Sequence, residues 1–374
     1  MLLFSRTDTS VFGRWWWTVD RWLVAALGLL MLFGGLMVTT ASPAVAERIG
    51  APDTYFITRH LIFLLLSAGL MLALSMLQPR QILLLAGAAF LLGLFAMVLV
   101  VGSPLGLDIK GAKRWIRLPG LGSLQPSEFV KPAFIILNAW LLAHQSVRSG
   151  FGTTLLPLLL LGIVVGLLML QPDFGMTAVV TFIWIAQIFL AGLPLYLVVF
   201  GGVACVLGSI GVYLTFLHVS SRIDRFLDPA SGDTYQVDRA MEAFRSGGMF
   251  GVGPGQGVIK DQIPDAHADF IFAVAGEELG LLWCLIILGL IAFIVLRGFY
   301  RSGQGPTLFV TLASAGLLVQ FALQSLVNIS SSLHLIPTKG MTLPFVSYGG
   351  SSLLATALGM GMLLALTRRR THAP

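Results

Sequence analysis

The sequence has little charge and almost no cysteine. Asp, Glu, Lys and Arg make up 11% of its 374 residues, while 56% are hydrophobic and the mean hydropathy is +0.89. Soluble domains carry about 25% charged residues, so this composition excludes an ordinary water-soluble protein. Cys205 and Cys284 lie in separate apolar runs and can build neither a disulfide framework nor a zinc site. The six histidines are scattered, and we expect no metal site.

Two ligand-binding signatures are also absent. Six glycines lie from Gly247 to Gly257, but no strand precedes them and no Gly-Lys-Ser/Thr sequence ends them. They match neither the dinucleotide fingerprint nor the P-loop, and we interpret them as a mobile loop that lets a substrate pass. Apolar runs separate the basic residues behind the net charge of +6. Anionic lipid is therefore their favoured partner, and no nucleic acid is expected.

Long apolar runs dominate the chain instead. A transmembrane helix needs about 20 mainly apolar residues. Runs that suit spans lie at about 22–41, 56–77, 81–102, 127–145, 154–170, 176–190, 195–217, 270–296, 306–329 and 345–367. We expect an all-α integral membrane protein with ten transmembrane helices, in one polytopic domain over residues 1–374. The bundle covers 22–367, and a large extracytoplasmic loop at 218–268 separates the seventh and eighth helices.

The distribution of Lys and Arg orients this bundle. With ten spans both termini share one side, which carries ten of the 23 basic residues but only two of the 17 acids. The other side holds the remaining basic residues in about twice the loop length, so their density there is lower. Segments 1–21 and 368–374 are therefore expected in the cytoplasm. The outer basic residues concentrate in 110–131 and 222–260, where either an external anion or the neighbouring acids balance them.

Three carboxylates mark the start of the eighth predicted span. Asp269 opens the apolar run, and Glu277 and Glu278 follow about two turns deeper. A charged side chain in the hydrocarbon core costs about 2.5–3.5 kcal/mol on insertion scales, so such residues are functional candidates. The alternative is structural: Asp269 caps the helix, and the two glutamates anchor it at a membrane interface.

The first outer loop combines cations with an aromatic ring. Residues 114–118 predict a short strand, which Pro119-Gly120 turns back. Lys113 and Arg114 offer phosphate donors beside Trp115, whose ring is suited to lie on a lipid or a sugar. A simple interfacial anchor is the alternative for this tryptophan.

Other outer segments have recognisable local patterns. Ser127 suits an N-cap, and Glu128 and Lys131, three residues apart, share a face of the helix that follows. This pair is either part of a site or a structural ion pair. Asp173 suits a tight turn between two spans. Between 236 and 246, apolar residues at helical spacing predict an amphipathic helix.

Several motifs, taken in order, resemble the SEDS family (shape, elongation, division and sporulation proteins). They are Lys110-Gly111-Ala112-Lys113-Arg114-Trp115-Ile116, Gln125-Pro126-Ser127-Glu128, Gln171-Pro172-Asp173-Phe174-Gly175, Arg225-Phe226-Leu227-Asp228-Pro229, Gly232-Asp233-Thr234-Tyr235-Gln236, Ala266-His267-Ala268-Asp269-Phe270-Ile271-Phe272-Ala273-Val274, Pro337-Thr338-Lys339-Gly340 and Pro344-Phe345-Val346-Ser347-Tyr348-Gly349-Gly350-Ser351-Ser352. Each motif is modest, but the ordered set is specific. Two of them, at 232–236 and 337–340, are similar to the cell-division members more than to the elongation members. Ala268 departs from the threonine that many relatives carry before the aspartate.

The resemblance implies a peptidoglycan glycosyltransferase that polymerises lipid II at the outer face of the cytoplasmic (inner) membrane. It implies that Asp269 is the catalytic residue. The substrate-binding residues that we expect with it are Lys113, Arg114, Trp115, Glu128, Lys131, Asp173, Arg222, His267, Lys339, Ser347 and Ser351. No cofactor is required, although a divalent cation could accompany the pyrophosphate.

The same resemblance implies partners and leaves alternatives. Expected partners are a single-span class B penicillin-binding protein, lipid II with undecaprenyl pyrophosphate, and other membrane proteins of the divisome. A lipid II flippase and a noncatalytic divisome scaffold remain alternatives. A flippase needs polar groups along its whole path, whereas here most charges belong to the outer half, which favours an enzyme.

Overall fold

The computed structural model describes residues 10–109, 112–118, 122–145, 155–192, 195–228 and 234–369. The helices are α1 (Val11–Thr18), α2 (Arg21–Ala41), α3 (Pro43–Arg48), α4 (Tyr55–Ser75), α5 (Pro79–Gly102), α6 (Pro126–Gln145), α7 (Leu155–Leu170), α8 (Phe174–Leu190), α9 (Leu195–Thr215), α10 (Leu217–Leu227), α11 (Tyr235–Gly247), the 3₁₀ helix η3 (Lys260–Gln262), α12 (Ile271–Ser302), α13 (Leu308–Ser332) and α14 (Gly350–Leu366). An antiparallel sheet, in the order β1 (Gly106–Ile109), β2 (Ala112–Leu118), β3 (Gly122–Leu124), lies between α5 and α6.

The fold is that of an almost entirely helical membrane protein, which confirms the predicted class. Each of the ten ranges expected to span contains a helix. In the described part of the chain, α2, α4, α5, α12 and α13 are long and apolar enough to cross a membrane. Helices α7, α8 and α14 are apolar but shorter, and a bend of 99° separates 201–215 from 219–227. That all ten cross the membrane remains a prediction.

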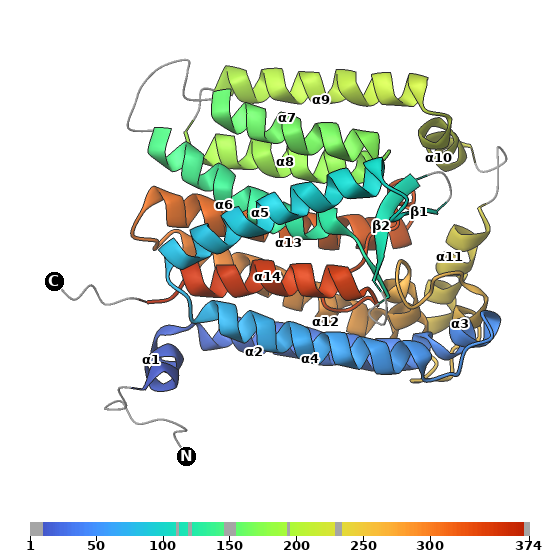
Figure 1. Cartoon of the computed structure of the whole chain (residues 1–374). Coiled ribbons are helices and arrows are strands. Elements are labelled where there is room, and N and C mark those ends of the chain that lie inside the picture. Colours follow the sequence, from blue (N-terminus) through green and yellow to red (C-terminus); the bar gives the residue numbers. More distant parts are fainter. Residues whose placement is uncertain are drawn as a thin grey trace.

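The helices pack side by side, with the sheet and several short helices gathered at one end (Figure 1). Helix α14 lies inside the bundle against α4, α6 and α13, and nearly all of its side chains are buried. Helices nearer the outside expose leucines, as at Leu65, Leu91 and Leu92, because their outer faces meet lipid rather than water. The sheet, α3, α10 and α11 occupy the end opposite α1 (Figure 1). The fold therefore separates one end rich in loops from the end that bears α1.

Helix α12 is broken near its start, and the glycine-rich segment fills the break. Gly280 has φ 79° and ψ −178°, a conformation open to glycine. Backbone N–H groups of Val252 and Leu281 donate to the carbonyls of Glu277 and Gly248, at 3.0 and 2.9 Å. The interpretation of 247–257 as a mobile loop is therefore wrong for the first half of this segment, because these hydrogen bonds hold its backbone against the backbone of α12.

The two glutamates of α12 hold the rest of that segment. Glu277 is 1% exposed and accepts hydrogen bonds of 2.7 to 2.8 Å from the backbone N–H groups of residues 258–260. Glu278 is fully buried and pairs with the Lys260 ammonium, which also donates to the Thr40 carbonyl at 2.8 Å. The alternative of an interfacial anchor is wrong for both, because their carboxylates turn inward and fix the loop.

The segments at the loop-rich end agree with the sequence predictions, with one correction. The strand expected at 114–118 lies within β2, and the amphipathic helix is α11, which ends at Gly247. Helix α6 begins at Pro126, so Ser127 lies inside its first turn and is not an N-cap. The Pro119-Gly120 turn, the Gly232-Asp233 pair and most of the 368–374 tail lie outside the described residues.

Candidate functional site

A cavity of about 630 Å³ opens at the loop-rich end of the bundle. Residues from α4, the sheet, α6, α8, α10, the 267–269 turn, α13 and the loop from α13 to α14 form its wall. Its charged and polar lining consists of Arg59, Arg114, Ser123, Gln125, Glu128, Asp173, Arg222, His267, Asp269, Gln324, Thr338, Lys339, Thr342, Tyr348, Ser351 and Ser352. Elements far apart in the sequence thus bring most of the predicted site residues together.

Asp269 lies in the wall just before α12. Its carbonyl accepts a hydrogen bond of 3.0 Å from Asn328 Nδ2, which also donates to the Met341 carbonyl at 2.6 Å. A Cβ added at Gly340 would lie 2.9 Å from Asp269 Oδ2, so the carboxylate faces the loop that follows α13. The N-cap of α12 is Phe270, which has no side-chain capping bond. The capping alternative for Asp269 is therefore not supported.

The loop from α13 to α14 also supports the backbone at the aspartate. Ser347 Oγ donates to the Ala268 carbonyl at 2.5 Å and accepts from the Leu343 N–H at 2.8 Å. The Tyr348 N–H donates to the His267 carbonyl at 2.9 Å. Ser347 lies outside the cavity lining, so its described contacts are with the backbone on either side.

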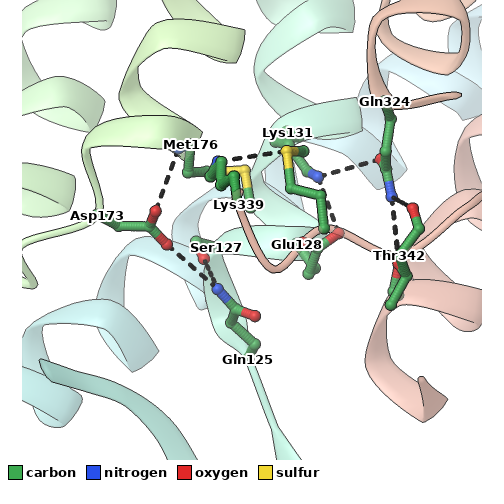
Figure 2. Close-up of polar contacts among 11 residues, drawn as sticks. Gln125, Ser127, Glu128, Lys131, Asp173, Met176, Gln324, Lys339 and Thr342 are labelled. Carbon is green, nitrogen blue, oxygen red and sulfur yellow. Dashed lines mark hydrogen bonds and ion pairs between the residues drawn. The ribbon is translucent and has the colours of Figure 1, made fainter. Parts of the chain in front are cut away.

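Arg114 and Asp173 form the ionic pair at the α7–α8 turn. Asp173 caps α8 by accepting from the Met176 N–H at 3.1 Å, which confirms its place in a turn. Its other oxygen lies 3.6 Å from Arg114 Nη1. The same oxygen lies 3.5 Å from Gln125 Nε2 (Figure 2). Arg114 donates in addition to the Gln171 carbonyl at 3.3 Å. The strand β2 is thereby attached to the start of α8.

Glu128 and Lys131 share a helix face, as predicted, and form a buried ion pair of 2.8 Å. Lys131 is 1% exposed and lies behind the cavity wall, where it also donates to Gln324 Oε1 at 3.3 Å (Figure 2). Gln324 Nε2 in turn donates to the Thr342 carbonyl and to Ser352 Oγ, both at 3.3 Å. The ion pair thus belongs to a network that joins α6, α13 and the start of α14.

Lys339 enters the cavity between α8 and α6 (Figure 2). Its Nζ lies 3.3 Å from Met341 Sδ, and within the described chain no carboxylate comes within ion-pair distance of it. Its side chain rests directly on Gly175, where a Cβ would overlap it. Burial lowers the pKa of Lys339 to about 8, although the nearby Asp173 carboxylate opposes this shift.

The other predicted residues fall into two groups. Trp115, Arg222 and Ser351 line the cavity. Arg222 comes from α10 and interacts electrostatically with both Asp173 and Asp269. Lys113 is exposed on β2 and lies outside the lining.

His267 also lines the cavity, among aromatic rings. Its ring packs on Phe56 at 4.4 Å and on Tyr348 at 5.1 Å between centroids. Burial lowers its pKa to about 4, so the imidazole is neutral at pH 7.

Sequence reasoning missed several polar residues of the wall and its support. Arg59 is a lone cation inside the second predicted span, and such a residue is a functional candidate on energetic grounds alone. Gln324 and Asn328 are amides four residues apart in the ninth predicted span, hence on one helix face. Both patterns are visible in the sequence, but only the fold shows that Arg59 and Gln324 line the same cavity and that Asn328 supports its wall from behind.

Comparisons with known proteins agree over the whole chain. Residues 20–372 match the family model described as "Cell cycle protein", which is named for FtsW, RodA and SpoVE. A Caulobacter vibrioides protein named "Probable peptidoglycan glycosyltransferase FtsW" is 46% identical over 374 residues, covering 99% of this chain and 94% of the relative. A Coxiella burnetii protein of the same name is 38% identical over 365 residues, covering 94% and 96%.

Solved structures share the fold. A chain from work described as "Structural coordination of polymerization and crosslinking by a peptidoglycan synthase complex" superposes with a TM-score of 0.78 at 29% identity, covering 93% of this chain and 97% of that one. The rod shape determining protein RodA of Thermus thermophilus gives a TM-score of 0.70 at 29% identity, covering 94% and 97%.

Proposed function

Because the chain belongs to the FtsW/RodA/SpoVE family of cell cycle proteins, we propose that it is a peptidoglycan glycosyltransferase of cell division. It polymerises lipid II into glycan strands. The names of its relatives support this activity, and one structural observation carries it further. The cavity at the loop-rich end brings the Asp269 carboxylate together with Arg114, Arg222 and Lys339.

The chemistry of chain growth requires these two kinds of group. The 4-hydroxyl of an acceptor sugar attacks the anomeric carbon of the donor, forming a C–O bond as the bond to the lipid diphosphate breaks. Asp269 takes the hydroxyl proton as a general base. The electron pair leaves with the diphosphate, whose growing charge is stabilised by the ammonium of Lys339 and the guanidinium group of Arg114. A diphosphate is a good leaving group, so a second carboxylate is not required.

The contacts divide the predicted substrate-binding residues by role. Lys131 lies behind the wall and is engaged by Glu128, so we assign it to positioning rather than to direct contact with the diphosphate. Ser347 likewise positions the backbone at Ala268. Any divalent cation would arrive on the diphosphate of the substrate, and the side chains named above would contact the oxygens it leaves open.

Orientation and partners complete the proposal. We place α1 in the cytoplasm and the cavity at the outer face of the inner membrane, because basic residues are denser on the side of the termini. The undecaprenyl chain of lipid II then lies in the membrane beside the cavity. The likeness to a chain of a peptidoglycan synthase complex supports a class B penicillin-binding protein as partner, with other divisome membrane proteins around it.

The test is to reconstitute the full-length chain in liposomes with labelled lipid II, with and without its transpeptidase partner. Glycan polymer and movement of lipid II between leaflets are scored in the same sample. The proposal expects polymer and no accelerated movement. Movement without polymer would identify a flippase, and neither product under conditions where the partner binds would identify a scaffold.

A further inference from the structure

A second, smaller pocket adjoins the main cavity and shares Arg222 and Thr338 with it. Its volume is about 40 Å³, and Arg225, Thr234 and His334 add to its polar lining. A cavity needs about 10–15 Å³ to hold one water, so this one accepts a group as large as a phosphate but not a sugar ring. Helix α10 and the loop after α13 thus line two adjacent compartments of different size.

The polar lining of this pocket is rich in hydrogen-bond donors and contains cations but no anion among its described residues. It contains two guanidinium groups, an imidazole and two hydroxyls, and no carboxylate among the described residues that form it. Arg225 Nε donates to the Ser221 carbonyl of the same helix at 2.9 Å. In the described chain its two terminal nitrogens have no ion-pair partner. Such forked donors match the oxygens of a phosphate.

Asp224 lies between the two arginines in the sequence of α10 and forms no ion pair with either one in the described chain, while Arg222 interacts electrostatically with Asp173 and Asp269 of the main cavity. Asp224 accepts a hydrogen bond of 2.8 Å from Tyr213 OH on α9. His334 is held on the other side, with its ring edge-on to Phe226 at 5.1 Å between centroids. The Thr234 hydroxyl donates to Asp238 Oδ2 at 2.6 Å, so the donors that the pocket offers to an anion are its two guanidinium groups, the imidazole and the Thr338 hydroxyl.

We propose that the pocket of Arg222 and Arg225 is a second anion subsite, which holds one phosphate of the acceptor substrate's diphosphate. This inference rests on the proposed function. Two lipid-linked molecules meet in each step, and each brings a diphosphate. The donor loses its diphosphate at the reacting carbon, beside Asp269 and Lys339. The acceptor keeps its own, a disaccharide away from the attacking hydroxyl, so the second diphosphate needs a separate set of cations.

The experiment counts diphosphate sites on the purified full-length protein. Farnesyl diphosphate, a short soluble prenyl diphosphate, is titrated in detergent by calorimetry. We expect two sites in the wild type and one in Arg225→Gln, with Arg225→Lys recovering part of the second. Arg245→Gln removes an exposed cation of α11 that lines neither pocket and is expected to keep both sites. Thermal unfolding checks that all variants fold.

A polymerisation arm separates this inference from the proposed function. In Arg225→Gln, the lipid II concentration for half-maximal polymer is expected to rise about tenfold while the maximal rate changes less, the equivalent of about 1.4 kcal/mol of binding. Two sites retained in Arg225→Gln would overturn the subsite even if the wild type polymerises. Two wild-type sites without any polymer would instead overturn the proposed function and leave an anion site. Equal displacement of the probe from the second site by phosphatidylglycerol micelles would assign that site to a phospholipid headgroup and overturn the acceptor role.

Discussion

Substituting Gly175 by alanine should displace the cavity lysine without removing its charge. A Cβ at this position would overlap the Cδ, Cε and Nζ atoms of Lys339. The backbone of α8 is fixed by the Asp173 cap, so the flexible lysine is the part that must move. Overpacking of this kind costs about 1–3 kcal/mol when a rigid neighbour is forced aside, and a mobile lysine places the cost at the low end.

The effect on activity should be larger than the effect on stability. If Lys339 stabilises the departing diphosphate, its displacement resembles the loss of one charge-stabilising donor, which lowers kcat about 10²–10³-fold in other enzymes. Lys339→Met should show a loss of the same order. The decisive sample is the double variant Gly175→Ala/Lys339→Met, because no ammonium group remains there for the added methyl to displace. We expect it to be no slower than Lys339→Met alone.

Initial rates of polymer formation from lipid II measure these effects, with thermal unfolding recorded on the same preparations. Gly166→Ala is the matched control, because a Cβ at Gly166 meets nothing within 4 Å. Full activity of Gly175→Ala, or losses in the two single variants that simply add in the double, would refute a role for the position of Lys339.

Two further predictions concern the buried pair behind the glycine-rich segment and the titration of the lysine. Lys260→Met leaves the Glu278 carboxylate buried without its partner, which should cost about 3–5 kcal/mol of stability. The double variant Lys260→Met/Glu278→Met should regain most of this stability, as measured by thermal unfolding. A double variant as unstable as the single variant would contradict the pairing. The polymerisation rate should fall as the pH rises through about 8, because Lys339 then loses its proton, and Lys339→Arg should move this fall to higher pH. The pKa of this lysine is lower in the folded than in the unfolded chain, so the unfolded state binds more protons between about pH 8 and 10.5. Over this pH range, the lysine's own contribution to the stability of the fold should therefore rise with pH while the activity falls. A pH–rate profile unchanged in Lys339→Arg would contradict the assignment.

The positions of the helices were predictable from the sequence, whereas the break within α12 was not. Apolar length located a helix in all ten expected ranges, and helical spacing located α11, because both signals are local. The break in α12 was not predictable, since membrane helices tolerate a single glycine such as Gly280. What opens the helix there is a set of hydrogen bonds from a segment about 30 residues earlier in the chain.

In the candidate site, too, contacts between residues close in the sequence were predictable, and contacts between distant residues were not. The spacing of Glu128 and Lys131 predicted their pairing, because side chains three apart share a helix face. Gln324 bonds to Lys131 across 193 positions, and only the packed bundle brings those residues together. The apolar run that Asp269 opens made this residue a functional candidate, and the resemblance to a family gave Asp269 and Lys339 their roles. Their separation in sequence carries no signal of contact.

The most direct test of the account is the polymer yield of Asp269→Asn. The purified variant, bound to its transpeptidase partner, is given lipid II beside Asp265→Asn. The control removes an exposed carboxylate four residues away that lies outside the cavity lining. We predict that Asp269→Asn folds, binds the partner and makes no glycan, whereas Asp265→Asn makes polymer at close to the wild-type rate. Polymer from Asp269→Asn at the rate of the control would contradict the proposed general base.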